Sequence, residues 1–231
     1  MNIYLFDIDG TIMLSGGAGM CAMTRVFHER YGIADAFRDF HFQGKVDPAI
    51  FREALVKHGV DGDHNGEIKA LIEMYETYIA EEMPRSPNPT LFPGVAELIQ
   101  AMTGRADISI GLLTGNVLGG AKAKLSRFDL WKYFPYGAFG NDSEDRPALV
   151  PIALDRAGAH LGTVVEPGPH VYIIGDTDRD IETARANGCT AVGVGTMNFS
   201  STELTELGAD IVFDDFSDTD RVLQELGVEH G

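Results

Sequence analysis

The sequence predicts an α/β fold: a doubly wound parallel sheet with an all-helical cap domain inserted after its first strand. Three observations predict it. In the second half of the chain, apolar runs alternate with helical patterns. These runs do not alternate between apolar and polar residues, which is typical of parallel strands covered by helices on both faces. A long segment without strand signals separates the first apolar run from this alternating part.

The first strand is predicted in the apolar run "IYLF", which Asp7 and Asp9 follow, with Gly10 and Thr11 after them. Side chains two positions apart point to the same face of a strand, so the two carboxylates are expected close together. Burying a carboxylate costs several kcal/mol unless a cation or hydrogen-bond donors compensate it. The pair is therefore either a solvated turn, in which Gly10 supplies a positive φ, or a functional site.

The segment without strand signals shows helical periodicity at residues 20–31, 48–58 and 67–82. It ends at "MPRSPNPTLFPG", which holds four of the ten prolines and is predicted to be a linker. We therefore expect two units. The core would comprise residues 1–14 and 92–231, and the helical cap with its linkers would comprise residues 15–91.

After the linker, strands and helices alternate. Strands are expected at residues 108–113, 171–174, 191–194 and 211–213. Helices are expected at about residues 117–128, 148–161, 178–187 and 202–207. In an open parallel sheet, ligands bind at the carboxyl ends of the strands, so a site is expected there.

Polar residues gather at three of these strand ends. They are Asp7 and Asp9 after the first strand, Thr114, Gly115 and Asn116 after the second, and Asp176, Asp178 and Asp180 after the third. Carboxylates at one edge of a sheet suit Mg²⁺, a hard cation that takes oxygen ligands and keeps waters for a phosphate. The helix after Asn116 begins with backbone amides that can receive an anion.

Two of the candidate site residues can also be explained by a purely structural role. Arg146 begins a helix, and it is either a solvated residue, as arginine usually is, or the positive charge that an anion site needs. Thr114 closes a strand, and a hydroxyl in that position is more often a cap for the next helix than a ligand.

Composition narrows the choice of partners. The chain has 231 residues, of which 44% are hydrophobic, and this is enough for a sizeable core. Its net charge of −17 repels nucleic acid and acidic membranes, so an anionic substrate would need a metal or a local basic patch. Cys21 and Cys189 fit no zinc or disulfide spacing. With no signal peptide and no membrane span in the sequence, a cytoplasmic location is expected.

Taken in order, these motifs closely resemble the haloacid dehalogenase superfamily of phosphohydrolases. The resemblance rests on D-x-D-G-T at residues 7–11, Thr114, the basic residue Arg146 and G-D-T-x-x-D at residues 175–180. The turn Phe92-Pro93-Gly94 resembles the return from cap to core in the phosphoglycolate phosphatase-like branch. Most relatives place a lysine where Arg146 stands, so the charge at this position is kept and the residue type is not.

The resemblance implies a Mg²⁺-dependent phosphatase that acts on a small phosphorylated metabolite. Asp7 would be the nucleophile that forms an aspartyl-phosphate. Asp9 would protonate the leaving oxygen and then activate the attacking water. Mg²⁺ would be held by the Asp7 carboxylate, the Asp9 backbone carbonyl and Asp176, with Asp180 in support.

The resemblance also implies a set of groups that stabilise the transferring phosphoryl oxygens. These groups would be the Thr114 hydroxyl, the amides of Gly115 and Asn116, and the Arg146 guanidinium.

Three alternatives to a phosphatase follow from the same residues. Dehalogenases and phosphonate hydrolases of the superfamily lack the second aspartate, so Asp9 speaks against both. A phosphosugar mutase of the family carries a cap-loop arginine near the position of Asp47, so a mutase is disfavoured but stays open. A non-catalytic receiver-like phospho-acceptor also stays open, although receivers are shorter and accept phosphate on a later strand.

The cap loop "FQGKVDP" carries Lys45, which is either a solvated lysine or a residue that meets the leaving group of the substrate. Gly44 is expected to let the backbone approach the core closely. The sequence leaves open which phosphate ester is the substrate and which oligomeric state the protein adopts.

Overall fold

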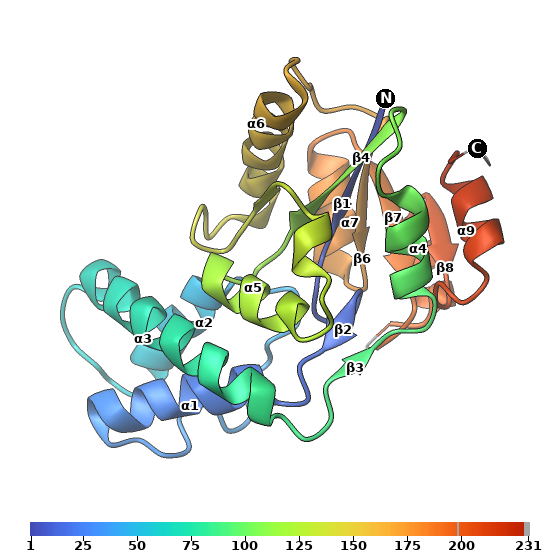
Figure 1. Ribbon diagram of the computed structural model, residues 1–231. Coiled ribbons are helices and arrows are strands. Elements are labelled where there is room, and N and C mark those ends of the chain that lie inside the picture. Colours follow the sequence, from blue (N-terminus) through green and yellow to red (C-terminus); the bar gives the residue numbers. More distant parts are fainter. Residues whose placement is uncertain (198, 229–231) are drawn as a thin grey trace.

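The computed structural model describes residues 1–197 and 199–228, and within them it has a six-stranded parallel sheet with helices on both faces (Figure 1). The strand order is β5-β4-β1-β6-β7-β8. The strands are β1 Asn2–Phe6, β4 Ile108–Leu113, β5 Gly137–Ala138, β6 Val171–Gly175, β7 Thr190–Val194 and β8 Ile211–Phe213. Every pairing in this sheet is parallel. The predicted doubly wound parallel sheet is therefore confirmed.

The alternation of side chains along β1 divides the core into two layers. Ile3 and Leu5 belong to the apolar cluster that includes α6, α7 and α8, whereas Tyr4 and Phe6 belong to the cluster that includes α4, α5 and α9. All four side chains are fully buried. The helices are α4 Val95–Met102, α5 Leu118–Ser126, α6 Leu149–Leu161, α7 Asp178–Ala186, α8 Ser201–Leu207 and α9 Thr219–Glu225. Each face of the central strand is thus shielded from water, as its continuous apolar sequence requires.

Three helices between β1 and β4 lie beyond the carboxyl edge of the sheet (Figure 1). They are α1 Ala18–Tyr31, α2 Asp47–Lys57 and α3 His64–Arg85, and we call them the inserted helices. Their core is aromatic, with Phe27 and Phe37 in edge-to-face contact at a centroid distance of 5.0 Å and Phe51 next to both. The Asp63 carboxylate caps the start of α3 by accepting hydrogen bonds from two backbone amides. The three predicted helices are present, within a few residues of the expected ends.

Short elements that the sequence did not predict complete the fold. β2 Met13–Leu14 pairs antiparallel with β3 Thr90–Leu91, so the chain enters and leaves the inserted helices through two adjacent strands. The two-residue strands β2, β3 and β5 are too short to show periodicity in a sequence. None of the helices in the described part of the chain has both the length and the apolar character that a membrane span requires.

Carboxylates from the inserted helices hold the start of α5. Asp47, the first residue of α2, accepts a hydrogen bond from the Val117 amide at 2.8 Å, and its own amide donates to the Gly115 carbonyl at 2.8 Å. Glu76 of α3 accepts one from the Gly119 amide at 2.7 Å. The first amides of a helix have no partner within the helix, so these carboxylates satisfy groups that would otherwise lack one. They tie the inserted helices to the sheet.

The Asp47 carboxyl is buried, and burial raises its pKa to about 7, although Lys124 and the Val117 amide favour the ionised form. The nearby carboxylates of Asp9 and Asp7 raise the pKa further. Because the folded pKa lies above the ordinary value, the folded state binds this proton more tightly than the unfolded chain. The resulting stability is present below the unfolded pKa and is lost as the pH rises through about 7.

Asp47→Asn keeps an acceptor oxygen for the Val117 amide but cannot ionise. We expect its stability relative to the unsubstituted protein to increase between about pH 4 and about pH 8, reaching a gain of about 1 kcal/mol or more. Urea unfolding at several pH values measures this difference. Asp61→Asn, at an exposed position, is the matched control and should show no such trend. A stability difference that stays constant with pH would contradict the buried titration.

Candidate active site

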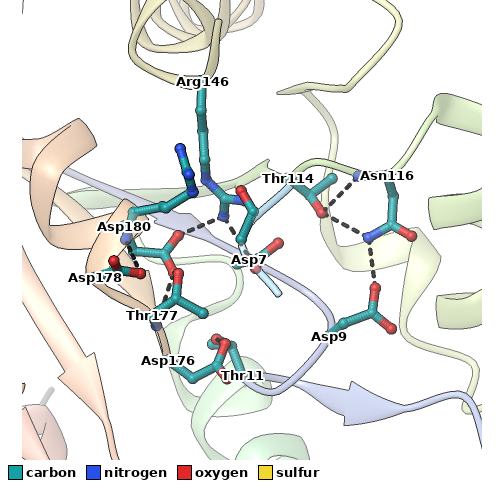
Figure 2. A network of polar contacts seen from close by, with 12 residues as sticks. Asp7, Asp9, Thr11, Thr114, Asn116, Arg146, Asp176, Thr177, Asp178 and Asp180 are labelled. Atoms are coloured by element: carbon teal, nitrogen blue, oxygen red, sulfur yellow. Dashed lines mark hydrogen bonds and ion pairs between the residues drawn. The ribbon is translucent and has the colours of Figure 1, made fainter. Parts of the chain in front are cut away.

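Three neighbouring strands bring their following residues together at one edge of the sheet (Figure 2). Asp7 follows β1, Thr114 follows β4 and Asp176 follows β6. Because β1 pairs with both β4 and β6, the three side chains come from adjacent positions. The Asp7 amide extends the pairing by donating to the Ile174 carbonyl at 2.9 Å. The backbone of Asp7 is therefore fixed by sheet hydrogen bonds rather than held in a free loop.

Asp7, Asp176 and Asp180 form a buried acidic cluster, whose carboxylate oxygens lie within 4.8 Å of one another. Burial raises the pKa of Asp7, and Arg146 opposes this shift. Burial also raises the pKa of Asp176 to about 8, and the charges of Asp180 and Asp7 add to the effect. Crowded buried carboxylates are costly, and a divalent cation would stabilise their ionised forms. The ligand atoms are all oxygens, which fits Mg²⁺.

Arg146 supplies the positive charge of the cluster. It begins the short 3₁₀ helix Arg146–Ala148 and is only 5% exposed, so the solvated alternative is wrong. Its Nη2 lies 3.1 Å from Asp7 Oδ2 and 2.5 Å from Asp180 Oδ1. Burial alone would lower the pKa of Arg146, but the two carboxylates outweigh burial and raise it. Its Nε is buried without a hydrogen-bond partner among the described residues, so one donor of the guanidinium stays unused.

Asp180 uses both of its carboxylate oxygens within the protein. Oδ1 accepts from Arg146, and Oδ2 accepts from the Thr177 amide at 3.1 Å and the Thr177 hydroxyl at 2.7 Å. The second set of contacts is a capping box that starts α7. Asp180 therefore connects the start of this helix to the guanidinium of Arg146. Its carboxylate also lies next to those of Asp7 and Asp176.

The D-x-D-G-T turn needs its glycine. Gly10 has φ +85°, in the left-handed region, and a Cβ there would lie 2.1 Å from a carboxylate oxygen of Asp176. The next residue, Thr11, donates its hydroxyl to Asp176 Oδ1 at 3.5 Å. The Gly10 amide donates to the Met13 carbonyl at 3.1 Å, which joins this turn to β2. The turn is thus packed against the acidic cluster without room for a side chain.

A second polar network lies on the other side of Asp7 and includes Asp9 (Figure 2). Thr114 Oγ1 accepts from both the amide and the Nδ2 of Asn116, at 3.3 and 2.8 Å. Asn116 Nδ2 also donates to Asp9 Oδ2 at 2.8 Å. Lys124 of α5 reaches the same Asp9 oxygen at 2.6 Å. The Thr114 hydroxyl thus bonds to the turn before α5 and does not cap the helix, whose N-cap is Val117 without a side-chain cap. Thr114 also favours the ionised form of Asp7, which lowers the pKa of that carboxyl.

The loop before α2 lies against the β4 end of the sheet, and the chain packs closely at two glycines. A Cβ at Gly115 would lie 2.3 Å from the Lys45 carbonyl oxygen. A Cβ at Gly44 would lie 2.8 Å from the side chain of Arg179 on α7, and the Gly44 carbonyl accepts a hydrogen bond from Arg146 Nη1 at 3.3 Å. The Lys45 ammonium pairs with Glu53 of α2 at 2.5 Å. Lys45 therefore lines the site with its charge already partnered.

A cavity of about 240 Å³ lies between the inserted helices and the acidic edge of the sheet. Its polar lining includes Asp7, Asp9, Asn116, Lys45, Arg146 and Asp176. Its apolar lining includes Leu14, Met20, Met23, Phe42 and Ile50, most of them from the segment that carries the inserted helices. This size suits a small molecule, and the wall formed by the inserted helices is mainly apolar.

Sequence reasoning missed Lys124, the buried role of Asp47, and Tyr75, whose buried hydroxyl has no hydrogen-bond partner within the described chain. For Lys124 a signal existed, because the N-cap residue Val117 and Ala121 and Leu125 of α5 form a buried stripe, and Lys124 lies seven residues after Val117. A lysine on a buried stripe indicates a partner of opposite charge. Neither Asp47 nor Tyr75 carries a comparable pattern.

The comparison with known proteins agrees with this geometry. The haloacid dehalogenase-like hydrolase family matches residues 4–194. The phosphoglycolate phosphatase of Salmonella choleraesuis (strain SC-B67) is 30% identical, over 80% of this chain and 71% of the relative. The crystal structure of a hydrolase from Pseudomonas syringae has a TM-score of 0.69 at 19% identity, covering 98% of this chain and 99% of that one.

A β-phosphoglucomutase from Clostridium difficile has the same TM-score of 0.69 at 15% identity, covering 98% of this chain and 97% of that one. At such identities the two solved structures show a shared fold alone. The family match spans most of the chain and includes Asp7, Asp9, Thr114, Arg146 and Asp176. The chain therefore belongs to the haloacid dehalogenase-like hydrolase family, as a hydrolase of phosphoric monoesters similar to the phosphoglycolate phosphatases.

Proposed function

We propose that the protein is a Mg²⁺-dependent phosphatase that hydrolyses a small phosphorylated metabolite through an aspartyl-phosphate intermediate. The observation that carries this proposal is the pairing of buried Asp7 with Arg146 at the base of a small cavity, beside further carboxylates. A carboxylate in that position can attack phosphorus, and a guanidinium can stabilise the charge on the transferring oxygens. The proposal includes cytoplasmic action, without nucleic acid or a membrane as partner.

In the proposed first step, a carboxylate oxygen of Asp7 bonds to phosphorus while the ester bond to the leaving oxygen breaks. Asp9 donates a proton to that oxygen, which leaves as an alcohol. In the second step, Asp9 accepts a proton from a water molecule that attacks the aspartyl-phosphate. Phosphate then leaves and Asp7 is restored. Splitting the hydrolysis into two displacements lowers the barrier of each.

The acidic cluster supports the proposed Mg²⁺ site. The ligands would be the carboxylates of Asp7 and Asp176 and the backbone carbonyl of Asp9, with Asp180 supporting the site through Arg146. When bound, the cation would supply positive charge that lets a phosphate dianion approach the carboxylates. The Thr114 hydroxyl, the amides of Gly115 and Asn116, and Arg146 are the proposed ligands of the phosphoryl oxygens.

We also propose that residues 15–91 act as a cap over a core made of residues 1–14 and 92–231. The contacts of Asp47 and Glu76 with the start of α5, and the apolar wall that the inserted helices give the cavity, support this division. In this arrangement the inserted helices exclude water during phosphoryl transfer and meet the leaving group of the substrate.

A phosphosugar mutase is the second candidate, because the solved structures with the same fold include a β-phosphoglucomutase. The contacts of Asp47 favour a phosphatase. This residue stands near the position of the mutase arginine, and here it is buried and bonded to Val117 rather than presented to a second phosphate. Turnover of p-nitrophenyl phosphate with release of inorganic phosphate tests the assignment. A single stable phosphorylation would instead indicate a receiver-like acceptor.

Removal of divalent cations is expected to abolish turnover, because the carboxylates of Asp7 and Asp176 repel one another and the substrate without a cation. Phosphate release from p-nitrophenyl phosphate, measured after exhaustive chelation and again after Mg²⁺ is restored, checks this. Full activity in the chelated protein would refute the metal requirement.

Asp7→Asn is expected to lower kcat by about three orders of magnitude or more with the fold intact, because the amide is nearly isosteric but not nucleophilic. Turnover, circular dichroism and thermal unfolding measure the two parts of this prediction. Asp129→Asn, at an exposed loop position, is the matched control and should keep full activity. Substantial hydrolysis by well-folded Asp7→Asn protein would show that another residue attacks.

Lys45→Ala is expected to raise KM about fivefold for the best substrate in a panel of phosphorylated metabolites, and to leave p-nitrophenyl phosphate hydrolysis almost unchanged. The reason is that Lys45 lines the cavity on the side of the inserted helices, where the leaving group would lie. The exposed Lys69→Ala is the control. Glu53→Gln removes the partner of the same ammonium and should not raise KM. Equal losses on both substrates, or none, would mean that Lys45 does not contact the leaving group.

A further inference from the structure

Lys124 is a buried lysine whose position the proposed reaction does not yet explain. It lies on α5 and is only 5% exposed, whereas Lys122 on the same helix is exposed. A lysine is almost never buried unless it is paired, because the ammonium loses its hydration. Gly19 of α1 lies against Lys124, since a Cβ at this glycine would be 3.9 Å from the Lys124 ammonium and 3.6 Å from the Tyr75 hydroxyl. The inserted helices therefore cover this lysine.

The contacts of Lys124 form a closed ring of three side chains. Its Nζ lies 2.6 Å from Asp9 Oδ2 and 2.5 Å from Asn116 Oδ1, and Asn116 Nδ2 donates to the same Asp9 oxygen at 2.8 Å. Asn116 is held in turn by Thr114. The Asp9 side chain is 41% exposed, so packing alone does not fix it. The ring fixes its orientation instead.

The hydrogen bonds from Lys124 and from Asn116 both end on the same oxygen of the Asp9 carboxyl group, Oδ2. In the acid form of a carboxyl group, the protonated oxygen is a donor and the other oxygen accepts. Lys124 has only donors, and Asn116 turns its NH₂ group toward Asp9, so Oδ2 must be the accepting oxygen. The proton of the acid form is therefore placed on Oδ1.

We propose that Lys124 is a positioning residue that holds Asp9 with its proton-donating oxygen, Oδ1, directed to the leaving group. This inference rests on the proposed phosphatase function. In the first step an Asp7 oxygen bonds to phosphorus, the ester bond breaks with its electron pair on the leaving oxygen, and that oxygen takes the proton from Asp9 Oδ1. The Asp9 carboxylate that results lies beside the Lys124 ammonium, which stabilises the new charge.

The test is the dependence of kcat/KM on the leaving group, measured with p-nitrophenyl phosphate, phenyl phosphate and ethyl phosphate. A p-nitrophenolate departs readily without a proton, whereas an alkoxide does not. We expect Lys124→Met to lower kcat/KM by about 10- to 100-fold for ethyl phosphate and by less than about threefold for p-nitrophenyl phosphate. Phenyl phosphate should lie between them. Lys122→Met, on the exposed side of the same helix, should match the unsubstituted enzyme on all three.

Combining Lys124→Met with Asp9→Asn distinguishes a role of Lys124 in positioning Asp9 from a general structural role of the lysine. If Lys124 acts through the Asp9 proton, Lys124→Met should cause no further loss in the Asp9→Asn background. Equal losses on the three substrates, or an additional loss in Asp9→Asn protein, would overturn the inference while the phosphatase function stands. Failure of the unsubstituted enzyme to hydrolyse any of the three esters would overturn the proposed function and this inference with it.

Circular dichroism establishes whether the Lys124→Met protein folds. If it does not, Lys124→Gln replaces it, because this side chain keeps a donor but loses the charge and the reach to Asp9. The Gln variant should show a selective loss in the same direction, largest for ethyl phosphate. Activity equal to that of the unsubstituted enzyme on every ester would overturn the positioning role.

Discussion

The structure depends on one electrostatic constraint: the three carboxylates of Asp7, Asp176 and Asp180 are buried together, and the guanidinium of Arg146 pairs with only two of them, Asp7 and Asp180. Like charges would move apart if they could. They cannot, because Asp7 and Asp176 directly follow strands that are hydrogen-bonded to each other, and Asp180 is fixed by the capping box of α7. A protein built only for stability would place apolar residues here. The parallel sheet supplies the rigidity that holds this unfavourable arrangement in place.

The same sheet explains why so much of the fold could be predicted from the sequence. Continuous apolar strands, such as the one at residues 108–113, are specified by local composition and need no partner to be recognised. The strand-end residues followed directly, since the carboxyl ends of parallel strands meet at one edge. The strand β5 and the helix α9 were not predicted. β5 has two residues, and α9 buries only Val222 and Leu223, so neither has a periodic pattern.

The parts of the site that the sequence did not predict depend on contacts between distant segments. Lys124 meets Asp9 across 115 positions of the chain, and Asp47 meets Val117 across 70. A local sequence pattern indicates that a residue lies on a buried stripe or starts a helix, but it does not identify the distant residue that this residue contacts. The loop around Lys45 shows the same limit, because no local pattern indicates that Gly115 of the core lies against the Lys45 carbonyl.

The antiparallel pair β2–β3 has a mechanical consequence. Both connections between the sheet and the inserted helices run through β2 and β3, and these two strands are hydrogen-bonded to each other, so the chain enters and leaves the inserted segment at one place. β2 is also bonded to the turn that carries Asp9, since the Gly10 amide donates to the Met13 carbonyl and Asp9 forms a backbone bridge with Met13. A displacement of β2 and β3 would therefore also displace the turn that holds Asp9, because backbone hydrogen bonds join the two.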